Sequence, residues 1–355
     1  MSADTMFARD ETVPAPFERH AAPEKKWVRA FAAYRDTSNT RAIYELALTT
    51  VLFVSAWLLS LWLIKTSVWL GLASTPVPAA LLVRMFAIQH DCGHNSLYSS
   101  RALNDWIGRA LGVVTFTPYD YWKHAHAIHH AGSGNLDKRG LGDITTLTVD
   151  EYLERGPMAR ALYRLYRHPI TLFVVGPAYM FILQHRLPIG VMTRGKMPWL
   201  STQFTNIAII VCSLALMWLV GWQDFLLLQI PVVALAASFG VWLFYVQHQF
   251  EETHWARKET WNRENAALYG SSYYDLPRPF MWLTANIGIH HVHHVSASVP
   301  FFRLPEIVRD YPELKTIGRL SFKDSLRCIP LTLWDDTHKE MISFRALNRR
   351  KLIEA

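Results

Sequence analysis

The 355 residues of the chain are 51% hydrophobic and only 18% charged, with 14 Trp, 14 Tyr and 18 Phe. Because a typical soluble domain is about 25% charged, this composition excludes a disordered, collagen-like or small disulfide-rich protein and favours a membrane-embedded domain with flanking lobes. The formal net charge of +7 suits an anionic membrane surface or a nucleic acid. The three cysteines form no CxxC pair that could hold a metal cluster.

Residues 1–42 are polar and contain several prolines, so they lack the apolar core of a signal peptide and predict a cytoplasmic N-terminal arm. Four apolar runs follow, each near the roughly 20 helical residues that a bilayer requires. They predict four transmembrane helices in two hairpins, over residues 43–64, 68–88, 206–221 and 225–246. A fifth run, residues 170–183, is shorter and is broken by Gly176 and Pro177, which predicts an interfacial or re-entrant helix.

The distribution of Lys and Arg supports this topology. With four spans, 34 of the 36 positive side chains fall on one side of the membrane, while Lys65 lies at a hairpin tip and Arg84 within a span. Positive side chains accumulate on the cytoplasmic side, so we expect both termini there, in a multi-pass protein of a bacterial inner membrane. The basic charge then belongs to the membrane surface and not to nucleic acid.

Histidine is the most unusual component, with 16 residues, half of them in three groups. Within each group the spacing is i, i+3 or i+4, which places the rings on one face of a helix, as the ligands of a metal site require. The groups are His90 and His94, then His126, His129 and His130, and then His290, His293 and His294. The same geometry places His124 and His291 off that face. With four spans, all three groups lie on the cytoplasmic side.

Eight clustered imidazoles would repel one another if protonated and would be costly to bury without partners, whereas neutral imidazole is a common metal ligand. A catalytic zinc takes about three protein ligands, so the surplus predicts two metal ions with about four or five nitrogens each. Two irons fit best, because they can share the reduction of dioxygen, while zinc has no redox chemistry. A ninth ligand is predicted at His248, at the cytoplasmic end of the fourth span, whereas His254 is off its helical face.

Three motifs resemble the histidine boxes of the membrane fatty acid desaturases in their order and separation: His90-Asp-Cys-Gly-His94, His126-x-x-His129-His130 and His290-x-x-His293-His294. The resemblance covers roughly residues 40–310. Residues 129–143, 246–251 and 286–294 are similar to the acyl-lipid branch that includes Δ12 (omega-6) desaturases. The resemblance implies a non-haem di-iron oxidoreductase that introduces a cis double bond into an acyl chain, while dioxygen and two electrons from a donor give water.

The expected fold is an all-α integral membrane protein, with two transmembrane hairpins, interfacial helices and a cytoplasmic helical cap that carries the metal site. We divide it into the arm of residues 1–42, a desaturase domain of residues 43–310 and a cytoplasmic tail of residues 311–355. Metal-bound imidazoles usually donate their other N–H to a carboxylate or carbonyl oxygen. Candidates for this role are Asp91, Asp143, Glu251 and Glu252. Asn286 is a candidate substitute for the asparagine that holds a water ligand in the acyl-CoA branch of the family.

The sequence has no HPGG haem motif, no iron–sulfur cysteines and no G-x-G-x-x-G nucleotide fingerprint, so we expect a separate electron donor of the ferredoxin or cytochrome type. The expected substrate is an acyl lipid, met from the surrounding membrane lipids. Related di-iron enzymes that hydroxylate lipids or carry out carotenoid hydroxylation or ketolation remain alternatives, as does a membrane zinc lipid hydrolase. The surplus of histidine ligands and the absence of a GxSxG or HExxH motif argue against the hydrolase. A metal transporter is disfavoured because the predicted spans contain no histidine.

Overall fold

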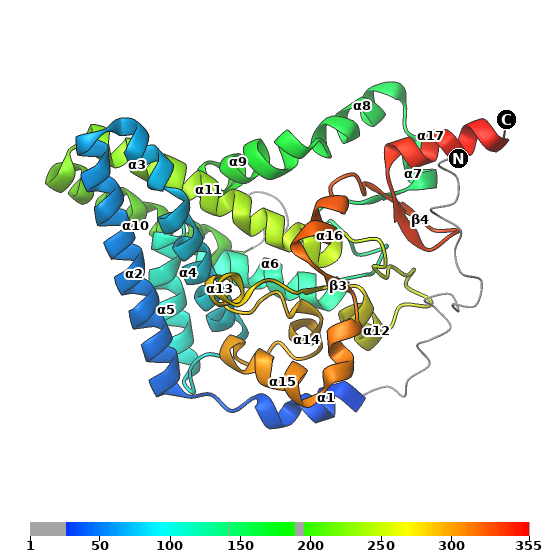
Figure 1. The fold of residues 1–355 in the computed structure, drawn as a ribbon, viewed down its shortest axis with the longest axis horizontal. Coiled ribbons are helices and arrows are strands. Elements are labelled where there is room, and N and C mark those ends of the chain that lie inside the picture. Colours follow the sequence, from blue (N-terminus) through cyan, green and yellow to red (C-terminus); the bar gives the residue numbers. More distant parts are fainter. Residues whose placement is uncertain (1–25, 141, 189–194, 355) are drawn as a thin grey trace, which may run out of the picture.

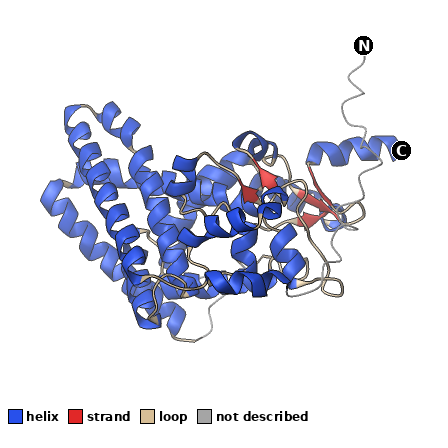
Figure 2. Cartoon of the chain, turned by 60° about the horizontal axis from the view of Figure 1, so that its bottom comes forward, coloured by secondary structure: helices blue, strands red, loops and turns tan. Residues whose placement is uncertain are grey.

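The computed structural model describes residues 26–140, 142–188 and 195–354. Within them the chain is mostly helical. Its few short strands lie in the half of the molecule that contains the C-terminus (Figure 1, Figure 2). The N-terminal arm predicted for residues 1–42 lies outside the described residues up to position 25. Its remaining part contains α1, Lys26–Ala30, and a 3-10 turn, Phe31–Tyr34.

Four helices are long and apolar enough to cross a membrane, which confirms the four predicted spans. They are α2, Asn39–Thr66; α3 with α4, Val68–Ser74 and Pro76–His94; α10, Met197–Val220; and α11, Trp222–His248. All four are longer than their predicted runs, because helical hydrogen bonding continues past the apolar residues into the polar segments at their ends. The last turns of α4 therefore carry His90 and His94.

The spans pack around a shared apolar core. Trp57 of α2, Leu82 of α4 and Leu228 of α11 are buried within it, and the Trp57 indole also donates a hydrogen bond to Gln229 of α11 at 3.0 Å. The outer faces of α2 and α10 expose apolar side chains, of which Trp218 is an example. An exposed apolar surface of this extent is the one that a lipid bilayer covers.

The remaining helices connect the spans and build a cap beyond them. Those between α4 and α10 are α5, Arg101–Val114; α6, Tyr119–Gly132; α7, Val149–Glu154; α8, Pro157–Tyr166; a π-helical turn, Thr171–Val175; α9, Gly176–Ile182; and a 3-10 turn, Gln184–Arg186. Those after α11 are α12, Arg263–Tyr269; α13, Arg278–Leu283; α14, His290–Val295; α15, Leu304–Asp310; α16, Phe322–Arg327; and α17, Phe344–Glu354, with 3-10 turns at Phe301–Arg303 and Pro312–Thr316. The run predicted as interfacial or re-entrant, residues 170–183, forms the π-helical turn and α9, outside the four candidate spans.

Short strands attach the C-terminal part of the chain to earlier segments. β1, Leu147–Thr148, pairs in parallel with β4, Leu333–Asp335, which is antiparallel to β5, Glu340–Ile342. β2, Tyr273–Tyr274, pairs in parallel with β3, Arg319–Leu320, in the register Tyr273 to Arg319. Residues 311–354 therefore pack into the cap through both small sheets.

The third histidine group lies on a separate apolar core within the cap. Val292 and Val295 of α14 pack there with Phe31 from the N-terminal segment and with Leu304 and Leu314. All five side chains are buried. Segments from the two ends of the described chain thus hold α14 in place.

An ion pair inside the spans connects the membrane helices to this cap. The guanidinium of Arg84 on α4 pairs with the carboxylate of Glu45 on α2, and both side chains are buried. Arg84 also donates to the hydroxyl of Thr49 at 3.0 Å and to the carbonyl of Trp282, whose ring centroid lies 4.0 Å from the guanidinium carbon. A charge within a span is tolerated only with such partners, and here the partners link α2 and α4 to the segment before α14.

Removing Arg84 leaves the buried Glu45 carboxylate with Arg41 as its ion-pair partner, at 2.6 Å, and the Arg41 side chain is 53% exposed. We expect Arg84→Met to lower the free energy of unfolding by about 3 kcal/mol, because the Glu45 carboxylate then loses its buried counter-charge and keeps only the half-exposed Arg41. The double variant Glu45→Gln with Arg84→Met should lose less than the single variant. Titration with SDS in mixed micelles measures both values, and a double variant at least as unstable as Arg84→Met would contradict the assignment.

Candidate metal centre

The predicted histidine ligands lie on four helices that meet at one end of the membrane-spanning bundle. His90 and His94 occupy the last turns of α4, and His248 ends α11. The second group lies in the last two turns of α6, and the third lies on α14. Because every ligand candidate is on a helix, the i, i+3 and i+4 spacings direct the rings to one side, as the sequence predicts.

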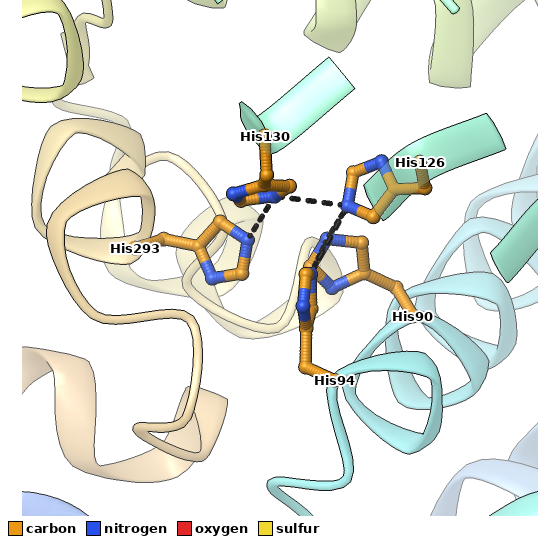
Figure 3. Close-up of side chains that lie close together, drawn as sticks. All are labelled: His90, His94, His126, His130 and His293. Carbon is orange, nitrogen blue, oxygen red and sulfur yellow. Dashed lines mark hydrogen bonds between the residues drawn. The ribbon is translucent and has the colours of Figure 1, made fainter. Parts of the chain in front are cut away.

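Nine imidazoles form two clusters that cut across the three sequence groups. Within each cluster the ring nitrogens that face one another lie within 4.8 Å of each other. The first cluster, drawn in Figure 3, contains His90, His94, His126, His130 and His293. The second contains His129, His248, His290 and His294. The i and i+4 rings of α6 thus face one cluster, and the i+3 ring between them faces the other.

The Nε2 atoms converge closely in both clusters. Nε2 of His126 lies 2.9 Å from Nε2 of His90, 3.1 Å from that of His94 and 3.1 Å from that of His130. In the second cluster, Nε2 of His290 lies 3.1 Å from Nε2 of both His248 and His294. Lone pairs that face a common point in this way are arranged for a shared metal ion.

His129 gives a more specific indication of a missing partner. Its Nδ1 is hydrogen-bonded to the carboxylate of Asp143. Its Nε2, which belongs to the second cluster, is buried and has no hydrogen-bond partner among the described residues. A buried nitrogen without a partner costs free energy unless something binds it. The donor set therefore fits a metal ion.

Burial keeps the rings of the cap helices neutral. Desolvation, reinforced by the neighbouring rings, holds the pKa well below the usual histidine value in His126, His130, His290, His293 and His294. These imidazoles are therefore neutral at physiological pH. This is the form of histidine that binds a metal ion.

Oxygen acceptors orient several of the rings from outside the clusters. Besides the Asp143 contact of His129, Nδ1 of His248 donates to the carbonyl of Gly270 at 3.1 Å. Nδ1 of His90 lies 3.2 Å from the Asp91 carboxylate, whose other oxygen accepts the backbone N–H of Phe301 at 2.7 Å. Such contacts fix which ring nitrogen carries the proton. The roles of Gly270 and Phe301 involve only backbone atoms, so no side-chain pattern in the sequence could have indicated them.

Other candidates from the sequence lie away from the clusters. Glu251 and Glu252 are exposed on the turn after α11, and within the described part of the chain neither has a hydrogen bond to a histidine ring. Asn286 donates to the carbonyl of Phe301 at 3.3 Å instead of facing a cluster. His291, predicted to be off the ligand face, contacts the carbonyl of Leu314 through Nε2 at 3.0 Å.

Aromatic side chains cover both clusters. Trp122 of α6 stacks on His126 with ring centroids 4.8 Å apart and an interplanar angle of 13°. A Cβ at Gly93 would lie 2.9 Å from the Trp122 ring, so the glycine in the first motif makes room for the indole. Phe244 of α11 packs against His129 and His248, at centroid distances of 5.1 and 5.2 Å. These rings cover part of the surface of both clusters.

Four apolar spans, two of which carry histidines of two clusters built only from histidine, define an integral-membrane protein whose site can hold metal ions. The sequence model of the family "Fatty acid desaturase" matches residues 67–319. The chain therefore belongs to the fatty acid desaturase family, and it is an oxidoreductase. The resemblance of its three histidine motifs to that family is confirmed.

Individual relatives agree with this assignment. A fatty acid desaturase of Bacillus subtilis is 40% identical over 327 residues, which cover 92% of this chain and 92% of the relative. An sn-1 acyl-lipid omega-3 desaturase (ferredoxin) of Synechocystis sp. is 27% identical over 64% of this chain and 63% of the relative. An sn-1 oleoyl-lipid 12-desaturase of the same organism is 24% identical over 67% and 65%.

The position of His248 in the second cluster leads to a test with a matched control. We expect His248→Ala to reduce the iron content of purified, iron-reconstituted protein, because the second cluster then has three histidines left. His254→Ala should leave the iron content unchanged, since His254 belongs to neither cluster. Elemental analysis per chain measures both variants. Equal iron content in the two variants would remove His248 from the ligand set.

Proposed function

We propose that the protein is a membrane-bound acyl-lipid desaturase that holds two iron ions and introduces a cis double bond into an acyl chain. The observation that carries the proposal is the pair of histidine clusters, five rings and four rings, at the end of four apolar spans. The proposed ligands are the nine histidines of these clusters. The catalytic unit is residues 43–310, with residues 1–42 and 311–355 as flanking cytoplasmic segments.

The composition of the clusters supports iron. Imidazole suits iron, zinc, copper and nickel, and a catalytic zinc takes about three protein ligands, fewer than either cluster offers. A bound iron pair would supply the oxidising power, with dioxygen as oxidant, that removal of two hydrogens from unactivated methylene carbons requires. The alternative of a zinc lipid hydrolase has no support in the family to which the chain belongs.

The protein's own groups prepare the site for this chemistry. Asp143 holds the Nδ1 proton of His129 and so directs the free Nε2 toward the second cluster. The Gly270 carbonyl does the same for His248. Trp122 and Phe244 cover part of the rings. A covered and preoriented site limits side reactions of an oxidised centre with solvent.

Aromatic residues before the second motif divide into two roles. Tyr119 is buried against Gly108 and donates to Asp105 at 3.2 Å, so it supports the fold of α5 and α6. Trp122 instead lies beside the first cluster and contacts Phe86, at 5.2 Å between ring centroids. We propose this pair as part of the wall for the acyl chain, whose burial is favourable by about 0.8 kcal/mol per methylene.

The electrons come from a separate donor in this proposal. The names of two cyanobacterial relatives, from Synechocystis sp. and Nostoc sp., include ferredoxin. We therefore propose a ferredoxin-type donor, with a cytochrome as the alternative. The four-span topology predicts 34 of the 36 Lys and Arg on one side of the membrane, and such a basic side suits an acidic partner at the proposed cytoplasmic face of a bacterial inner membrane.

Fatty acid analysis tests the reaction itself. Expression in a bacterium that makes no polyunsaturated acids should give acyl chains with one additional cis double bond, located by gas chromatography and mass spectrometry. His94→Ala should make no such product at normal expression, because the first cluster loses a ring, while His124→Ala should retain it. A hydroxylated chain in place of the new double bond would favour the hydroxylase alternative.

Single-cysteine labelling tests the orientation. In a background without the three native cysteines, probes at the exposed positions Thr66 and Gln223, at the hairpin tips, should react with an impermeant maleimide added outside intact cells. A probe at the exposed Lys258 in the cap should react only after the membrane is opened. Labelling of Lys258 in sealed cells would reverse the proposed topology.

A further inference from the structure

The short helix α8 exposes an apolar face that none of the described residues covers. Met158, Leu162 and Leu165 follow one another at i+4 and i+3, so they share one face of the helix. Their side chains are 74%, 58% and 60% exposed. Single exposed apolar residues are ordinary, but a face made of three of them marks a contact surface.

The opposite face of α8 is fixed to the cap. Tyr163 is buried there, its hydroxyl donates to the carbonyl of Thr332 at 2.6 Å, and it accepts the backbone N–H of Leu147 at 3.1 Å. Tyr163 also belongs to the apolar core that contains Leu333 and Ile342 of the small sheet. The orientation of α8 is therefore set by the cap, and its apolar face must point away from it.

The exposed apolar surface does not end with α8. It continues along the chain through Ile170, Val174, Val175 and Tyr179, all more than half exposed, in the π-helical turn and α9. α9 in turn packs against α11, which is one of the four candidate spans. Figure 1 shows α8 as an extension of α9 along the upper edge, with α7 and α17 below it. The apolar face of α8 is thus continuous with the lipid-facing surface of the spans.

Arginines lie beside this face. Arg155 is exposed just before α8, and Arg164 is exposed on α8, where it donates to the hydroxyl of Tyr152 at 2.7 Å and its guanidinium carbon lies 4.6 Å from the centroid of the Phe344 ring. An apolar face flanked by basic residues is typical of helices that lie in the plane of a membrane, with the positive groups at the level of the lipid phosphates.

We infer that α8 lies in the headgroup layer of the bilayer that holds the spans, with Met158, Leu162 and Leu165 inserted among the upper acyl chains. Its ten residues correspond to a helix about 15 Å long, too short to cross the membrane and long enough to rest on it. The partner is the lipid surface itself.

This placement sets the height of the metal site above the membrane. Arg167, directly after α8, is buried and donates to Gln249 at 3.0 Å and to the carbonyl of Thr145 at 3.2 Å. Gln249 follows His248, and Thr145 lies two residues after Asp143. A helix seated on the lipid surface is therefore connected by hydrogen bonds to two segments that carry groups of the second cluster.

Spin-label accessibility in single-chain lipid nanodiscs tests the inference. A nitroxide at Leu162→Cys in otherwise cysteine-free full-length protein should be accessible to oxygen and protected from a water-soluble nickel chelate. The ratio of the two accessibilities should approach that of a label at Leu214, which is exposed on the α10 span, and exceed several-fold that of a label at Lys258 in the cap.

Two results would overturn the inference. A label at Leu162 as open to nickel as the one at Lys258 would place α8 in water. A label shielded from both oxygen and nickel would mean that another part of the same chain covers this face. As a second measurement, Leu165→Glu should make a label at Leu162 several-fold more accessible to nickel, because the added charge lifts the helix from the lipid. An unchanged accessibility to nickel would count against lipid contact.

Discussion

The structure depends on bringing nine imidazoles together in two compact clusters, with six of the nine rings buried. Each ring loses hydration when it is buried, and protonation of any one would place a positive charge against its neighbours. Only a shared ligand for the inward-facing nitrogens makes this arrangement favourable, and His129 shows this most directly, with Asp143 on one nitrogen and no described partner on the other. The helices, the apolar packing and the cap all serve to hold these rings in place.

The membrane helices supply much of that rigidity. α4 and α11 leave the apolar core as continuous helices, so His90, His94 and His248 extend directly from elements fixed by packing within the spans. The Arg84–Glu45 pair adds a polar link from the same spans to the segment before α14. A site built on helix ends is held more precisely than one built on loops.

The cap closes the site from the other side. The N-terminal segment packs Phe31 onto the core of α14, while the C-terminal strands attach to β1 and β2. Histidines from α6 and α14 can then meet those of the spans, and the oxygen of Gly270 reaches His248. The inferred position of α8 on the lipid surface would place the cap and its histidine clusters at a fixed depth relative to the acyl chains of the lipid.

The sequence alone determined the four spans, the three histidine groups and the family, because hydropathy and helical spacing are local properties that each segment expresses wherever it packs. It also indicated His248, which lies at the end of a span. Only the tertiary structure decided how the rings divide, since His129 and His293 join clusters different from those of their sequence neighbours, and that depends on how distant helices cross. It likewise placed Asp143 against a ring and left Glu251 in solvent, although both are carboxylates near a histidine motif. Contacts between residues far apart in the chain, and backbone acceptors such as Gly270, leave no local pattern from which they could be predicted.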